Sequence, residues 1–184
     1  VNGDEGDFVL SEAAKLYKIA KTMDIIFDYY SLQANSRKVL TKLYANVKIE
    51  MNSGEYYKIS NELASTICNY LEKIISEMQL PLEYNANFDL SGILKVVDLQ
   101  IHSDPETLTE KMIDYMLAMK EFCGVNYFVF VGLKNYLPKE ELEQLYQEIA
   151  YQKYGVLLIE GEARRERIDC EVYHIIDHDL CEIY

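Results

Sequence analysis

The sequence predicts an α/β protein with a mostly parallel sheet flanked by helices and a projecting helical leg. Two continuous apolar runs, "YFVFV" and "VLLIE", are separated by an amphipathic segment, which is typical of parallel strands covered on both faces. A long apolar stripe at helical spacing fills the middle of the chain. With 184 residues, the chain is near the usual size of one domain and leaves room for an appendage.

The N-terminal part predicts a strand and then a helix. Residues 23–30, "MDIIFDYY", are rich in β-branched and aromatic residues and therefore favour a strand. Asn35 or Ser36 can cap a helix that begins at Arg37, because apolar residues recur there at spacings of three and four. The break "NSG" after Met51 ends this helix.

A second helix is predicted from about Glu55 until Pro81 stops it. Its apolar stripe is long enough to project beyond a compact sheet-centred domain. The stripe consists of Ile59, Leu63, Ile67, Tyr70, Leu71, Ile74, Ile75 and Met78.

The C-terminal half predicts further strands and helices. "LSGILKVVDLQIH" favours a short helix that turns into a strand near residues 97–101, and "SDPET" favours a cap with Pro105 in the first turn of the next helix. That helix carries a methionine-rich stripe, which we interpret as core, because flexible thioethers fill gaps between helix and sheet. The remaining predicted elements are a strand at 126–131, a helix at 138–152 led by Pro138, and strands at 155–160 and 171–176.

Charge and cysteine content limit the possible functions. The formal net charge is −13, so the averaged surface repels polyanions, and any nucleic-acid contact requires a segregated basic face. The four cysteines are scattered without metal-ligand spacing, and we expect a reduced, cytoplasmic protein. No apolar run approaches the ~20 residues that cross a bilayer, so we expect no membrane insertion.

The stretch "VGLKNYLPKEE" (131–141) passes from a strand into a helix, as phosphate-binding loops do, but it lacks their chemistry. It has one glycine, one lysine and no hydroxyl after the lysine. Pro138 removes a backbone N–H, while Glu140 and Glu141 place negative charge where a phosphate would bind. These residues therefore argue against nucleotide hydrolysis.

Five stretches together resemble the short CRISPR-associated adaptation proteins of type II-A systems. They are "ANSRKVLTKLY", "LPLEYNANFDLSGILKVVDLQI", "SDPETLTEKM", "NYFVFVGLKNYLPKEELEQL" and "YGVLLIEGE…YHIIDHD". The similarity runs from about Met23 to the end of the chain, with the motifs in the family's order. Family members begin with an additional strand and helix, which in this chain are either missing before Val1 or too diverged to recognise.

The resemblance implies a degenerate P-loop-NTPase-like head of residues 1–45 and 97–184, and a helical leg of residues 46–96. It implies a homotetrameric ring that threads linear double-stranded DNA, binds its ends and holds calcium ions. Such a ring serves spacer acquisition without hydrolysing nucleotide, so the protein is expected not to be an enzyme. Its expected partners are the integrase proteins and the RNA-guided nuclease of the same system.

Threading a duplex requires cations that contact phosphates without reading sequence. The candidate residues are Arg37, Lys38, Lys42, Lys48, Lys95 and Lys111. The first four lie on one predicted helix at spacings that let most of them share a side. Lys95 lies in the stretch that resembles the family best. The alternative interpretation of these residues is an ordinary solvated helix face.

Two further stretches are candidate binding sites, and each also has a purely structural explanation. "LPLEYNANFD" offers Glu83, Asn85 and Asp89 as oxygen ligands for calcium, although an Asn-rich turn explains the same residues. "EARRER" (162–167) could clasp phosphates, but the two glutamates that bracket its arginines favour a self-neutralised loop.

Two other functions stay open from the sequence. One is a nucleotide-using α/β enzyme whose phosphate loop lies upstream of Val1. The other is a protein-only interaction module whose acidic surface docks a basic partner.

Overall fold

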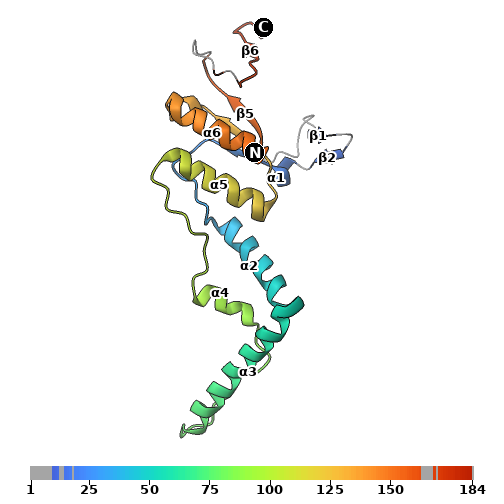
Figure 1. Cartoon of the computed structure of the whole chain (residues 1–184), viewed down its shortest axis with the longest axis vertical. Helices are drawn as coiled ribbons and strands as arrows, with labels where there is room; N and C mark the ends of the chain where they lie inside the picture. Colours follow the sequence, from blue (N-terminus) through green and yellow to red (C-terminus); the bar gives the residue numbers. More distant parts are fainter. Residues whose placement is uncertain (1–9, 13–14, 18, 163–167, 169, 184) are drawn as a thin grey trace. The chain divides into compact units, whose positions relative to one another are not determined.

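The computed structural model describes residues 10–12, 15–17, 19–162, 168 and 170–183, shown in Figure 1. The chain divides into two compact units, one drawn from Val1–Ala34 and Ser103–Tyr184 and the other from Asn35–His102. We call them the head unit and the leg unit. The expected domain boundaries, 45/46 and 96/97, both fall inside the leg unit of this division, and the predicted domains stay a prediction.

The head unit is built on a parallel sheet of β3 (Met23–Ile26), β4 (Tyr127–Val131) and β5 (Gly155–Ile159), in that order. The two longer strands coincide with the apolar runs from which a parallel sheet was predicted. The α/β fold class and the parallel sheet are therefore confirmed.

Two helices that contact each other, α5 (Leu108–Cys123) and α6 (Lys139–Gln152), flank this sheet (Figure 1). Thr107 caps α5 in a reciprocal capping box with Glu110, so the helix starts after the predicted cap and Pro105 lies outside it. The methionine-rich stripe is core, as predicted: Met112, Met116 and Met119 are at most 1% exposed.

The sheet is covered on both faces only at its central strand. Phe128, Val129 and Phe130 are consecutive in β4 and all buried, so side chains on both faces of this strand are covered. In the register of the sheet, Ile25 and Leu157 flank Val129 on one face, and they are 50% and 54% exposed. The prediction of complete coverage is therefore wrong at the edge strands.

The leg unit consists of α2 (Arg37–Met51), α3 (Gly54–Ser76), the 3-10 turn η1 (Leu90–Gly92) and the short helix α4 (Ile93–Val96). The predicted break separates α2 from α3, with Asn52 as the C-cap of α2 and Gly54 at φ +50°. Within this unit η1 contacts α2, and the chain from α3 returns to α4, as Figure 1 shows.

The two ends of the leg unit are joined by one side chain. The Asn35 amide donates to the Ile101 carbonyl and accepts from the Ile101 N–H, both at 2.8 Å. Ile101 thus bonds to an amide side chain instead of a neighbouring strand, and the described residues 97–101 form no strand. The strand predicted there is wrong.

Two other predicted strands are shorter than expected. β3 ends at Ile26, because the Asp28 carboxylate accepts the N–H groups of Tyr30 and Ser31 in a turn. The strand predicted at 171–176 is reduced to β6 (Ile175–Ile176), which pairs antiparallel with β7 (Glu182–Ile183). Near the N-terminus the structure adds β1 (Leu10–Glu12), β2 (Lys15–Tyr17) and α1 (Ile19–Thr22).

Candidate nucleic-acid interface

Helix α2 presents a row of exposed cations along one side. Ser36 caps the helix by accepting the N–H of Val39, which fixes the register of the residues that follow. At 100° per residue the cations fall within about 140° of the helix circumference, away from the buried Val39. The exposed cations of this row are Arg37, Lys38, Lys42 and Lys48.

Lys48 and Lys95 come together although they are distant in sequence. Both line a shallow hollow of about 290 Å³ in the leg unit, bordered by α2 on one side and by η1 and α4 on the other. The other residues of the hollow are Tyr44, Ala45, Asp89, Ser91 and Gly92. The structure therefore brings five of the six predicted DNA contacts into one unit, on α2 and α4.

Asp89 forms an ion pair with Lys48 within this hollow. The Lys48 Nζ lies 2.5 Å from the Asp89 Oδ2, while Oδ1 accepts the N–H of Ser91 as the N-cap of η1. Hydrogen bonds from Lys48 and then from Ser91 lower the pKa of Asp89 to about 2. Both side chains are about half exposed, so water screens the pair and a phosphate group can compete for the lysine.

Lys111 differs from the other candidates. It is a residue of α5 in the head unit, and its Nζ donates to the Tyr30 carbonyl oxygen at 2.5 Å. Its side chain is half-buried, so part of its hydrogen-bonding capacity already serves the turn after β3.

The predicted calcium ligands are largely engaged with protein groups. Asn85 Oδ1 accepts the N–H of Asn87, and both Asp89 oxygens have donors, as described above. Calcium binds through several carboxylate or carbonyl oxygens, so the ion would have to share or displace these hydrogen bonds, and the calcium site stays a prediction. Among the residues that the structure describes, no three His, Cys, Asp or Glu side chains are placed to hold a metal.

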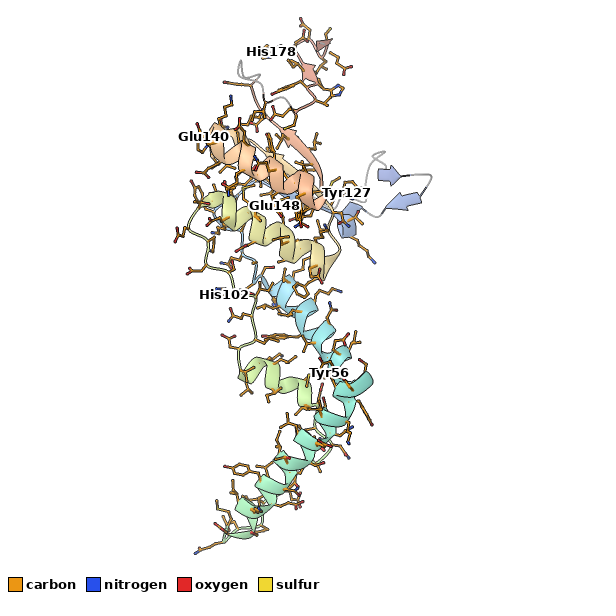
Figure 2. All side chains as sticks on the ribbon, viewed as in Figure 1. Tyr56, His102, Tyr127, Glu140, Glu148 and His178 are labelled. Carbon is orange, nitrogen blue, oxygen red and sulfur yellow. The ribbon has the colours of Figure 1, made fainter. Side chains whose placement is uncertain are left out.

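The turn after β4, where a phosphate loop would lie, is filled by the chain's own side chains. Gly132 adopts φ 68° at the end of β4, and Lys134 follows it in η2 (Leu133–Asn135) with only 8% of its surface exposed. The Lys134 Nζ lies 2.7 Å from the carboxylate of Glu171. Glu140, labelled in Figure 2, lies with Glu141 in the first turn of α6, where both interact favourably with the helix dipole and oppose a bound anion.

Within "EARRER", residues 163–167 lie outside the described part of the chain.

The fold and this surface define an α/β protein with a helical appendage that carries exposed cations. A family model described as "CRISPR-associated protein (Cas_Csn2)" matches residues 1–180. The chain belongs to this Csn2 family of CRISPR-associated proteins, and the resemblance found in its motifs is confirmed.

A curated relative supports the same assignment. The protein named "CRISPR-associated protein Csn2" from Streptococcus agalactiae is 25% identical over 177 residues, which covers 96% of this chain and 77% of the relative. The chain therefore has a CRISPR-associated role. In the described part of the molecule, no helix combines the length and apolarity needed to cross a bilayer.

Proposed function

We propose that this protein binds the ends of linear double-stranded DNA during type II-A spacer acquisition, as a homotetrameric ring without enzymatic activity. The observation that carries the proposal is the row of exposed cations on α2, extended by Lys95 across the shallow hollow. Such cations bind phosphates irrespective of sequence, as a protein that captures foreign DNA requires.

Assembly would overcome the unfavourable net charge. One chain carries −13, and a single row of cations is a small part of its surface. A closed ring repeats the same row in every copy and directs it at one lumen, so the local charge there can be positive.

Helix α3 supplies a surface suited to a second copy of the chain. Its apolar residues recur at spacings of three and four along one stripe, yet the helix has no buried residue. Tyr56, labelled in Figure 2, starts the stripe and is 52% exposed, and Ile59 is 58% exposed. An exposed stripe of this kind marks a protein-protein contact. Its members are Tyr56, Ile59, Leu63, Ile67, Tyr70 and Ile74.

The non-enzymatic part of the proposal is supported by the turn after β4. Lys134, which a nucleotide-binding loop would direct at phosphates, is paired with Glu171.

Calcium, the integrase proteins and the RNA-guided nuclease are proposed as partners from family membership. Calcium would need oxygen ligands beyond those that the Glu83–Asp89 loop leaves open.

Binding to linear and covalently closed duplexes of equal length, measured by fluorescence anisotropy with and without calcium, tests the proposal. We expect the linear duplex to bind more tightly. Replacing Lys48 and Lys95 with glutamine should weaken binding and reduce the salt slope by about 0.9 for each phosphate that is no longer neutralised. The matched control replaces Lys58 and Lys139 with glutamine. Both are exposed and lie outside the row on α2 and the hollow. Equal affinity for both duplexes, or equally weakened binding in both double variants, would contradict the proposal.

A further inference from the structure

The turn after β4 has the position of a ligand site. Parallel α/β sheets bind their ligands at the carboxyl ends of the strands. Lys134 lies two residues beyond Gly132 at this end of the central strand, and only 8% of its surface is exposed to water. A lysine so deeply buried requires an anionic partner, because an unpaired buried ammonium is strongly unfavourable.

Three donors from different segments converge on one carboxylate there. The Nζ of Lys134 lies 2.7 Å from both oxygens of Glu171. The hydroxyl groups of Tyr146 on α6 and of Tyr173 donate to the same carboxylate. One ammonium and two hydroxyls directed at a single planar anion are the donor set of an oxyanion site.

The charged state of Glu171 is maintained in spite of its burial. Burial by itself would raise the pKa of Glu171, but the hydrogen bonds from Lys134, Tyr146 and Tyr173 together lower it below its usual range. Burial, and then the hydrogen bond to Glu171, raises the pKa of Tyr146, which keeps this hydroxyl a donor. The side chain of Glu171 is only 9% exposed, so this ion pair is shielded from water, unlike the pair of Lys48 with Asp89.

A second carboxylate restricts what the site can hold. Glu160 follows β5, and its Oε1 accepts the backbone N–H of Lys134 at 3.1 Å. Its negative charge orients the loop and opposes a multiply charged ligand. The site therefore suits one small oxyanion of single charge.

We propose that the carboxyl end of β4 is an oxyanion-binding site that the chain occupies itself. The Glu171 carboxylate takes the place of an external ligand at Lys134, Tyr146 and Tyr173. The segment that carries Glu171 thereby closes the site, and a free carboxylate or a phosphate monoanion enters only when this side chain is removed.

Chemical rescue in the 184-residue chain tests the proposal. In Glu171→Ala, the melting temperature should be lower than in the wild type and should rise by at least about 3 °C when acetate or inorganic phosphate replaces chloride at equal ionic strength. The wild type should show only the general effect of each salt on folded proteins, and the rise in Glu171→Ala counts as selective where it exceeds that effect. Glu171→Gln, which fills the space with a neutral amide, and Glu140→Ala, at an exposed position, should show no selective rise.

A second substitution tests whether Lys134 is the cation that binds the added oxyanion. Adding Lys134→Met to Glu171→Ala should abolish the selective rise, because the central cation of the site is gone. If Glu171→Ala is unfolded in chloride, acetate or phosphate should restore its circular dichroism spectrum. No selective effect of either oxyanion in Glu171→Ala, whether folded or unfolded, would overturn the proposal. Rescue that persists without Lys134 would overturn it as well.

Discussion

At the scale of single residues, two acid–base pairs of the molecule differ in what surrounds them. Lys48 and Asp89 are about half exposed, whereas Lys134 and Glu171 are at most 9% exposed. Water and salt screen the first pair, so Lys48 can exchange its partner for another anion, and in the proposed complex that anion is a DNA phosphate. The second pair is shielded, and removing either member leaves an uncompensated buried charge.

Asp89→Asn should tighten DNA binding roughly twofold to fivefold at low salt, because it removes the negative charge that competes for Lys48. Anisotropy with a linear duplex measures this. Glu83→Gln is the matched control, since it removes a negative charge from the same loop without freeing a lysine. If Asp89→Asn instead weakens binding and removes a response to calcium, Asp89 is a calcium ligand in the assembled protein.

Glu171 should make stability depend on pH in the acid range. Its pKa in the folded protein lies below the usual 4.5, so its contribution is fully present above pH 4.5 and disappears as the pH falls through the lowered value. We expect the stability difference between the wild type and Glu171→Gln to shrink below pH 4.5. Urea unfolding from pH 7 to pH 3 measures this, and a difference that grows on acidification would contradict the assignment.

At the scale of elements, the side chain of Asn35 links the two ends of the leg unit. The Asn35 amide makes two hydrogen bonds of 2.8 Å with the backbone of Ile101. These bonds replace the pairing that a strand would give, and they connect residues 66 positions apart. The start of α2 and the end of the segment after α4 are thereby held together.

Asn35→Ala should lower the free energy of unfolding by about 1–3 kcal/mol, because it leaves two partly buried backbone groups of Ile101 without their partners. Hydrogen exchange gives the sharper readout: the amide proton of Ile101 should become less protected, by more than the amide protons in α5. Asn69→Ala, on the exposed surface of α3, serves as control. Unchanged protection at Ile101 would show that the junction is held by other contacts.

At the scale of the whole molecule, DNA binding and assembly should be coupled. A chain of net charge −13 with its cations in a row on α2 needs neighbouring copies to surround a duplex with positive charge. The exposed apolar stripe on α3 is the surface that we expect to bring copies together.

Leu63→Glu should therefore reduce the molar mass in solution and weaken binding to linear DNA together, because it places a charge in the middle of the stripe. Light scattering coupled to size exclusion measures the mass, and anisotropy measures the binding. Ser65→Glu adds the same charge on the opposite side of α3 and should change neither. A monomeric Leu63→Glu that binds DNA as tightly as the wild type would separate the two properties.

Local patterns were enough to predict much of the fold and part of the site. The helix from Arg37 to Met51, the buried methionines of α5, and strands β4 and β5 follow from the spacing of apolar residues and from caps and breaks, which act within a few residues. The cations of α2 lie on one side of the helix because their spacing in the sequence matches the helical period. The lack of phosphate-loop chemistry between residues 131 and 141 was also evident from the residues themselves.

Only the tertiary structure decided which charges meet. Lys48 and Asp89 are 41 positions apart, and Lys134 and Glu171 are 37 apart, so no local pattern indicates either pair. The sequence alone determined which segments are helical, which strands are apolar and which residues are cationic, because those properties depend on near neighbours. The folded chain determined that one lysine stays available to a ligand while another is enclosed, because burial and pairing depend on segments that only folding brings together.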